Sequence, residues 1–496
     1  MTSETFDVVE TTISDIHAAY GTGMLTARQL VETYFGRIDA YDKKGPAINA
    51  IISLNPRALD EADRLDSAHR KSGPVGPLHG IPVIMKDQGD IAEMPTTMGS
   101  VLFEGHMPGR DAFAVAKMKE AGAIFIGKAT LGELGAGDTY GSLFGETHNV
   151  YDQERTAGGS SGGSAASVSA NFCTVAVGQE GLASIRRPSI WNGIAGMRPT
   201  AGLVSRTGIY GGWPSINGSL GPMARTVTDL ATLLDGMVGY DPEDPVTAYG
   251  VGHVPASFAD GLDANALTGA RIGIYRAPMG LGSEPDSDDF KQITEVFDRA
   301  VAELADAGAV IVDDVPAPDF KTQLTKRAGS PDGGDEAFQL YFAGSAGAPF
   351  ASREEAAASP LFARLTKGAR DRWLTPRPSP EKFREYLEAR ETLMTDLLKI
   401  MADHRLDAIV HKAVEHQPTL IRGGINPPYV DQKGAPVLNT FLIFVPSVVV
   451  PAGFTRDDLP AGITFLGRPY DDAKMIGFAY AYEHATRHRR EPIFCR

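Results

Sequence analysis

Short apolar stretches alternate with stretches of helical periodicity along the first 130 residues of the chain. The apolar segment IPVIM (residues 81–85) has the length of a buried strand and ends at Lys86. Apolar residues recur at helical spacing from Leu30 to Tyr41, and a helix at 111–121 leads into a strand at 123–126. Such alternation predicts a layered α/β fold with a largely parallel sheet.

The rest of the chain continues this pattern, with one segment of weaker character. Helices are expected at 226–239, 286–308, 379–404 and from Asp472, and strands at 270–275, 408–410 and 443–450. Residues 323–380 are rich in Gly, Ala, Ser and Pro, so we expect peripheral loops and short helices there. Because we find neither repeats nor a clean linker, we expect a single domain over residues 1–496.

Composition limits the partners of the protein. The 496 residues are 43% hydrophobic and 22% charged, as in a soluble globular protein, and the formal net charge is −15. That charge argues against nucleic acid or an anionic membrane as partner, because both attract Lys and Arg. Two cysteines, an acidic N-terminus without a signal and no long apolar run together predict a cytoplasmic protein.

The strongest local signal is GGSSGGS at residues 158–164, which precedes an Ala/Val stretch of helical character. A phosphate-binding loop would need Lys followed by Ser or Thr, but Ser164 is followed by alanines. Ser160 or Ser161 could be the nucleophile of a Ser-His-Asp α/β-hydrolase, an esterase, although the polar stretch before them is unlike a strand. A third arrangement places one hydroxyl of this loop beside a second hydroxyl and an amine.

Several further motifs carry a resemblance to a known family. They are LHGIPVIMKD (78–87), GAIFIGKATLGELG (122–135), GQEGLASIRRPSIWNGIAGMRP (178–199), SLGPMARTVTDLATLLDGMVG (219–239) and VPAGFTRDDLPAGITFLG (450–467). In order and spacing, with the GGSSGGS loop, they resemble the amidase signature family. The resemblance covers about 20–240 and 400–490, and it leaves about 250–400 as a variable segment on the substrate side.

The resemblance implies a fold, a reaction and site residues. It implies an α/β/α sandwich with a central mixed, largely parallel β-sheet, and a hydrolase that cleaves the C–N bonds of amides without a cofactor. The family's catalytic lysine corresponds to Lys86, its serine in a cis peptide to Ser160, and its nucleophile to Ser184. The backbone N–H groups of the oxyanion hole correspond to Gly181, Leu182, Ala183 and Ser184.

Elementary chemistry supports such a triad. A serine hydroxyl becomes a good nucleophile when a base takes its proton, and lysine is a base only when neutral. Holding a lysine neutral at pH 7 against a reference pKa near 10.4 costs about 4.6 kcal/mol, so the site must lower this pKa. Ser160 can accept the proton of Ser184 and pass its own to Lys86, and the reverse path protonates the leaving amine.

The chain departs from the family at several positions. Leu182 and Ala183 replace two glycines before the nucleophile, and Glu180 replaces an aspartate. Arg187 stands where an apolar residue is usual, His411 and Lys412 replace Pro-Thr, and Phe444 replaces glycine. We expect the side chains at 182 and 183 to crowd the oxyanion hole without removing its N–H donors, and the changes at 187, 411–412 and 444 to reshape the pocket rather than the chemistry.

Aromatic and apolar residues near the motifs predict the substrate class. The expected pocket residues are Tyr140, Phe144, Ile209, Tyr210, Trp213, Phe441 and Phe444. They would bury a ring or alkyl chain, so we expect aryl or apolar amides, and by extension carbamates (urethanes), as for aryl acylamidases and urethanases. The alternative is an amidotransferase subunit that acts in a complex.

Competing sites have weaker support. His411 and His416, with Glu415 between them, lack a third metal ligand at recognisable spacing, so no metal is expected. Cys173 lies in an apolar strand-like segment, which predicts a core residue. The expected partner is therefore a small amide or carbamate, and the sequence leaves a homodimer open.

Overall fold

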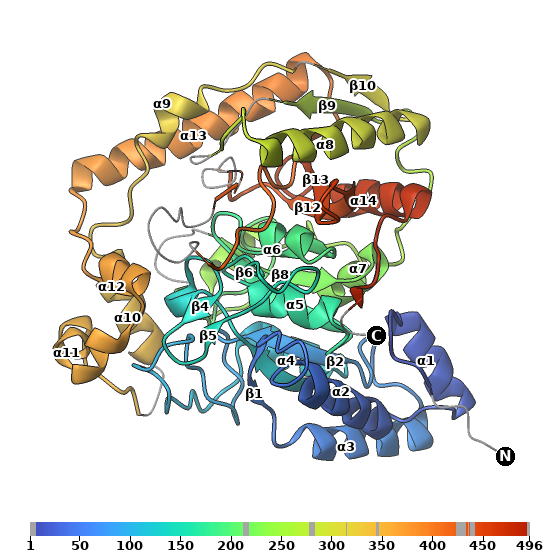
Figure 1. The fold of residues 1–496 in the computed structure, drawn as a ribbon, viewed down its shortest axis with the longest axis vertical. Coiled ribbons are helices and arrows are strands. Elements are labelled where there is room, and N and C mark those ends of the chain that lie inside the picture. Colours follow the sequence, from blue (N-terminus) through green and yellow to red (C-terminus); the bar gives the residue numbers. More distant parts are fainter. Residues whose placement is uncertain are drawn as a thin grey trace.

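The fold is that of a computed structural model of the whole chain, shown in Figure 1. It describes residues 6–211, 218–276, 283–313, 315–343, 347–422, 433–434, 436 and 442–493. A mixed sheet of eleven strands runs through the molecule in the order β1-β3-β2-β6-β8-β7-β12-β13-β11-β9-β10. Helices flank this sheet, so the α/β/α sandwich expected from the sequence is confirmed.

The strands alternate in direction across much of the sheet. They are β1 (Ile51–Leu54), β2 (Pro82–Lys86), β3 (Ile124–Ala129), β6 (Val175–Glu180), β7 (Ala195–Arg198), β8 (Ser219–Ala224), β9 (Arg271–Tyr275), β10 (Val310–Val312), β11 (Ala408–Lys412), β12 (Ser447–Phe454) and β13 (Pro460–Leu466). Parallel pairing occurs in the blocks β3-β2-β6 and β11-β9-β10, and the other neighbours are antiparallel. A short hairpin of β4 (Tyr140–Gly141) and β5 (Gly145–Glu146) lies apart from this sheet.

Helices form many of the connections between the strands. They are α1 (Ile13–Thr22), α2 (Ala27–Tyr41), α3 (Ala58–Ser72), α4 (Phe113–Glu120), α5 (Gly162–Ser169), α6 (Arg186–Trp191), α7 (Val227–Asp235), α8 (Asp288–Asp306), α9 (Phe320–Leu324), α10 (Gly333–Ala343), α11 (Arg353–Ala358), α12 (Lys367–Trp373), α13 (Pro380–Asp403) and α14 (Asp472–Thr486), with 3-10 turns η1 (Glu133–Gly135), η2 (Pro245–Gly250) and η3 (Pro360–Arg364). The short α9 to α12 confirm the expectation for residues 323–380.

Local sequence signals explain several of these boundaries. Thr26 accepts a hydrogen bond from the N–H of Gln29, whose side chain accepts one from the N–H of Thr26, so the capping box fixes the start of α2. The α13 helix begins at Pro380 after the cap Ser379, because proline suits the first helical position. The strand β2 ends at Lys86, as its apolar run predicts.

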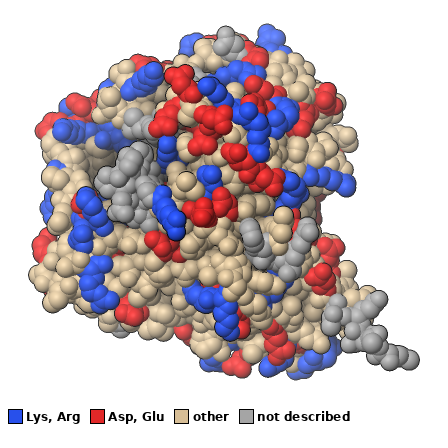
Figure 2. Space-filling view, viewed as in Figure 1, with Lys and Arg blue, Asp and Glu red and all other residues tan. Residues whose placement is uncertain are grey.

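Acidic and basic side chains are interspersed over the face shown in Figure 2. No helix within the described ranges combines the length and the apolar character that crossing a bilayer requires.

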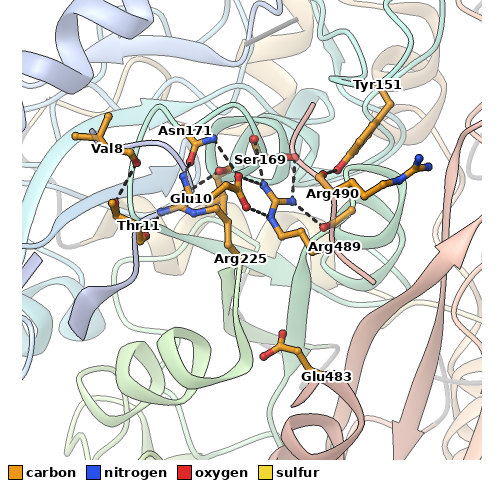
Figure 3. Close-up of polar contacts among 12 residues, drawn as sticks. Val8, Glu10, Thr11, Tyr151, Ser169, Asn171, Arg225, Glu483, Arg489 and Arg490 are labelled. Atoms are coloured by element: carbon orange, nitrogen blue, oxygen red, sulfur yellow. Dashed lines mark hydrogen bonds and ion pairs between the residues drawn. The ribbon is translucent and has the colours of Figure 1, made fainter. Parts of the chain in front are cut away.

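Residues 8–11 and 489–490, each near one end of the chain, meet beside α5 in a network that we call the terminal clasp (Figure 3). Arg489 donates from Nε to Glu10 Oε2 over 2.6 Å and from Nη2 to Glu10 Oε1 over 2.7 Å. The same guanidinium donates to the carbonyl of Ser169 at the end of α5, and Asn171 Oδ1 accepts from the Glu10 N–H. The clasp therefore ties residues from both ends of the chain to the helix that follows the Gly/Ser loop.

Candidate active site

Lys86 occupies the end of a strand with parallel neighbours on both sides, β3 and β6, and its side chain is fully buried. Its Nζ donates hydrogen bonds to Ser160 Oγ over 2.7 Å and to the carbonyl of Gln179 over 3.3 Å. Burial lowers the pKa of Lys86 from 10.5 to about 7, although the negative charge of Glu180 opposes this shift. A substantial neutral fraction of this lysine is therefore present near pH 7.

Ser160 lies in the GGSSGGS loop just before α5, and the Gly159–Ser160 peptide bond is cis. Its Oγ accepts from Lys86 and donates to the carbonyl of Gly135 over 2.9 Å. A Cβ atom on Gly159 would lie 2.4 Å from the carbonyl oxygen of Gly137 and 2.7 Å from Cα of Asp138, which explains why glycine stands there. The loop thus brings the Ser160 hydroxyl between an amine and a backbone acceptor.

Ser184 lies in the turn between β6 and α6 and is 5% exposed. The N–H of Ser161 donates to the carbonyl of Ser184 over 3.0 Å, so this turn is held against the Gly/Ser loop. Within the described part of the chain, this backbone contact is made by Ser161, the neighbour of Ser160, and no hydrogen bond joins the Ser160 and Ser184 hydroxyls. Proton transfer between these hydroxyls requires that they come within hydrogen-bond distance of each other.

A buried ion pair shapes the turn that carries Ser184. Glu180 Oε2 accepts from the N–H groups of Ile185 and Arg186, over 2.8 and 2.9 Å. Arg186 donates from Nε to Glu180 Oε1 over 2.6 Å and from Nη2 to the Leu182 carbonyl over 2.7 Å. Both side chains are fully buried, so the glutamate that replaces the family's aspartate acts as an internal brace of this turn.

The backbone N–H groups of residues 182–184, at the predicted oxyanion hole, are available to bind an oxyanion. Among the described residues, none accepts a hydrogen bond from the N–H of Leu182, Ala183 or Ser184. Gly181, Leu182 and Ser184 all line a cavity of about 480 Å³, which we call the Ser184 cavity. Free N–H groups beside a candidate nucleophile can stabilise the oxyanion of a tetrahedral intermediate.

The Ser184 cavity has a mixed wall. It is lined by Gln88, Leu134, Gly135, Ala136, Gln179, Gly181, Leu182, Ser184, Tyr210, Gly211, Arg327, Ala328, Gly329 and Tyr386. Gln88 donates from Nε2 to the Tyr210 carbonyl over 2.9 Å and accepts from the Tyr210 N–H at its own carbonyl over 2.8 Å. Aromatic and aliphatic surface thus lies next to side-chain amides and one arginine.

The structure brings only part of the expected substrate pocket to this cavity. Tyr210 lines it, and Ile209 lines a small neighbouring pocket that shares Gln179 and Gly211 with it. Phe144 instead lines a second cavity, of about 390 Å³.

The remaining expected pocket residues lie elsewhere or cannot be placed. Tyr140 forms part of the β4 strand of the small hairpin. Phe444 lies under the guanidinium of Arg390, 5.8 Å from it. Trp213 and Phe441 fall outside the described residues.

Several wall residues were not expected from the sequence. Arg327 follows α9 and Tyr386 lies in α13, both within the segment 250–400 that lacks a recognisable motif. Gln88 stands two residues after Lys86, and Gln179 lies in the strand that precedes the Ser184 turn. The proximity of these two glutamines to the candidate catalytic motifs is a signal that sequence reasoning could have used.

Arg187 supports the Gly/Ser loop from behind and does not line the Ser184 cavity. It forms an ion pair with Asp138, donates from Nη2 to the Gly159 carbonyl over 3.3 Å, and stacks 4.6 Å from the Trp191 ring. This arginine therefore changes the support of the cis peptide, whereas we expected it to alter the pocket.

The residues of the competing metal and cysteine sites have surroundings that do not match those functions. His411 is fully buried, with Nδ1 near the Lys412 carbonyl, and Lys412 Nζ donates to Thr294 Oγ1 over 2.7 Å. Within the described ranges, no cluster of three or more His, Cys, Asp or Glu could hold a metal ion. Burial raises the pKa of the Cys173 thiol to about 12, which keeps it protonated and a poor nucleophile.

Comparison with known proteins gives similarity to amidases and to a related amidotransferase subunit. The family model described as Amidase matches residues 29–476. A probable amidase of Arabidopsis thaliana is 30% identical over 521 residues, which cover 99% of this chain and 93% of the relative. A glutamyl-tRNA(Gln) amidotransferase subunit of Symbiobacterium thermophilum is 30% identical, over 94% of this chain and 95% of its own. The X-ray structure of native peptide amidase from Stenotrophomonas maltophilia is 32% identical with a TM-score of 0.83, over 98% and 99% of the two chains.

Proposed function

Because the chain belongs to the amidase signature family, whose members include hydrolases of C–N bonds, we propose that it is a serine-dependent amidase with Ser184 as its nucleophile. The observation that carries this proposal is the contact of 2.7 Å between buried Lys86 and Ser160, beside the cavity that Ser184 lines. Ser160 and Lys86 are the proton-transfer partners of the nucleophile.

The proposed reaction begins with neutral Lys86. Ser184 Oγ attacks the substrate carbonyl carbon as its proton moves to Ser160, whose own proton turns from the Gly135 carbonyl and moves to neutral Lys86. The carbonyl oxygen becomes an oxyanion and accepts hydrogen bonds from the free N–H groups of residues 182–184. A low-dielectric site strengthens those bonds, since little water competes for the charge.

The tetrahedral intermediate then loses its amine. Protonated Lys86 returns a proton through Ser160 to the leaving nitrogen, and the C–N bond breaks to leave an acyl ester on Ser184. Water attacks this ester by the same relay, which releases the carboxylic acid and restores the Ser184 hydroxyl. A carbamate would follow the same steps through a carbonate ester, which water opens to an alcohol and carbon dioxide.

The proposed substrates are amides with an aryl or apolar group, and carbamates of the same kind. Leu134, Leu182, Tyr210 and Tyr386 supply apolar wall surface, and each Å² of apolar surface that they cover contributes roughly 25 cal/mol. An anilide has a better leaving group than an alkyl amide, so it tolerates an oxyanion turn crowded by Leu182 and Ala183.

Peptide amides are the second substrate class to test. The similarity to a peptide amidase suggests it, and two wall residues, Gln88 and Gln179, carry amide groups that can pair with a peptide backbone.

The decisive experiment uses the purified chain alone with a nitroanilide of a short fatty acid, a peptide amide and an aryl carbamate. We expect hydrolysis of the anilide, complete loss in Ser184→Ala, and a mass increase on Ser184 after treatment with a fluorophosphonate. A chain that cleaves nothing alone but releases ammonia from glutamine in a complex would favour the amidotransferase alternative. The similarity to the Symbiobacterium thermophilum protein is the reason to test this alternative.

A further inference from the structure

The loop that holds the Gly135 carbonyl receives its support from a distant helical segment. Ser160 Oγ donates to this carbonyl over 2.9 Å, so the position of Gly135 sets the direction of the Ser160 hydroxyl. The loop, residues 132–136, is also tied to Ser160 through the Gly132 N–H, which donates to the Ser160 carbonyl over 3.0 Å. Any shift of the loop therefore reaches the proposed proton relay directly.

The conformation of this loop is unfavourable without outside contacts. Leu134 adopts a left-handed φ of 60°, in which the Cβ of a leucine crowds the backbone. Such a conformation persists only where surrounding structure holds it. Within the loop's own neighbourhood, the N–H of Leu134 donates to the Met98 carbonyl over 2.9 Å.

The outside support comes from the start and the end of α12, more than 230 residues further along the chain. Glu133 is 1% exposed, and its Oε2 accepts from the N–H of Thr366 over 2.8 Å, while its Oε1 accepts from the Ser142 hydroxyl. Arg372 donates from Nη2 to the carbonyls of Glu133 and Ala136, each over 3.1 Å. The two carbonyls flank Gly135, so α12 grips the loop on both sides of the acceptor of Ser160.

The α12 helix has an anchor of its own. Figure 1 shows α10, α11 and α12 gathered at one side of the molecule. Trp373 at the end of α12 packs edge to face with Phe338 and Phe362, and the Arg353 guanidinium lies 4.7 Å from its ring. An element fixed in this aromatic cluster can hold the loop in place.

We propose that Glu133 and Arg372 are positioning residues that hold the Gly135 carbonyl against the Ser160 hydroxyl, so that the α12 segment tunes the proton relay. This inference rests on the proposed function, because it assigns a role within the same relay. Neither residue touches substrate in the proposed mechanism; each acts through the loop.

The test compares Arg372→Ala, Arg372→Lys and Arg370→Ala in the full-length enzyme, with the nitroanilide as substrate. Arg370 lies on the same short helix, but its Nη1 donates to the carbonyls of Ala363 and Leu365 and not to the 132–136 loop. For Arg372→Ala we expect kcat to fall on the order of tenfold to a hundredfold with KM within about twofold. Arg372→Lys should recover part of kcat, and Arg370→Ala should resemble wild type.

A second variant, Glu133→Gln, and the rate of fluorophosphonate labelling provide two further tests. Glu133→Gln cannot accept from both Ser142 and Thr366, so it should lower kcat in the same direction as Arg372→Ala. Both variants should slow fluorophosphonate labelling of Ser184, while their thermal midpoints match that of Arg370→Ala.

The outcomes separate the two proposals. If KM rises while kcat stays unchanged, or if Arg372→Ala behaves as Arg370→Ala does, the positioning role is refuted while the amidase proposal stands. If wild type cleaves no amide and Ser184 is not labelled, the amidase proposal and the positioning role both fail.

Discussion

At the scale of single residues, the burial of Lys86 links the fold to the chemistry. Its pKa near 7 means that protonation increases as the pH falls below this value, and a protonated lysine cannot accept the proton passed on by Ser160. We therefore predict that kcat/KM for the anilide rises with pH through about 7 and then levels off. The measurement is a pH profile of kcat/KM from about pH 5 to about pH 9.

Substitutions of the relay residues provide the matched test. Lys86→Ala and Ser160→Ala should each reduce kcat by several orders of magnitude, since each breaks the path of the proton. Lys86→Ala with full activity across the pH range would show that the relay is wrong.

Arg327 gives a prediction about substrate charge. Arg327 is the one cationic residue among the described residues that line the Ser184 cavity. None of these lining residues is acidic. An anionic group on the substrate would gain from a guanidinium partner. We predict that an anilide with a carboxylate on its acyl group is favoured over its cationic analogue, and that Arg327→Gln reduces this preference about tenfold.

The comparison needs neutral and charged members of one substrate series. The kcat/KM of the neutral anilide should change little in Arg327→Gln, which serves as the internal control. An unchanged ratio of anionic to cationic substrate would mean that Arg327 does not face the bound acyl group.

At the scale of elements, the connection from β6 to α6 depends on one buried ion pair. Removing Arg186 leaves the Glu180 carboxylate buried without its cation, and such losses destabilise proteins by about 3 to 5 kcal/mol. We predict that Arg186→Met lowers the thermal midpoint and abolishes activity, because the turn that presents Ser184 loses its brace. Differential scanning calorimetry and the anilide assay measure the two effects.

An exposed arginine provides the control for this substitution. Arg64 lies on the solvent side of α3, so Arg64→Met should leave both the thermal midpoint and the activity near those of wild type. Equal midpoints for Arg186→Met and Arg64→Met would contradict the bracing role.

At the scale of the whole molecule, the terminal clasp joins Glu10 to Arg489 beside α5. Burial raises the pKa of Glu10, but the charge and hydrogen bonds of Arg489, the charge of Arg225 and the hydrogen bond of Asn171 together outweigh burial, and the net pKa lies below the ordinary value of 4.5. A carboxylate with a lowered folded-state pKa stabilises the fold above its unfolded-state pKa, and this contribution disappears as the pH falls through the folded-state value. We predict that Glu10→Gln lowers the free energy of unfolding by about 2 kcal/mol at pH 7.

The pH dependence distinguishes this clasp from an ordinary packing effect. The difference between wild type and Glu10→Gln should be constant from neutral pH down to about 5 and should shrink below about 4.5, where Glu10 of the unfolded chain begins to be protonated, until folded Glu10 is protonated too. A difference that stays constant into acid would show that the charge of Glu10 does not contribute.

Local patterns predicted most of the helices and strands, the family resemblance supplied the triad candidates, and the predicted pocket was largely wrong. The capping box of α2, the start of α13 at Pro380 and the end of β2 at Lys86 all follow from signals within a few residues. The pocket was predicted from aromatic residues near the motifs, and of these only Tyr210 lines the Ser184 cavity among the described residues. Nearness in sequence to a motif does not determine which way a loop side chain faces.

The sequence by itself determined where most strands and helices form, because periodicity, caps and glycine requirements act over short distances along the chain. The triad candidates came from the resemblance to the amidase signature family and not from these local rules. Only the tertiary structure decided which partners hold those residues. Thr366 supports Glu133 across 233 positions, and Arg489 binds Glu10 across 479. Such contacts depend on how the sheet brings distant segments together, and no local pattern encodes that distance.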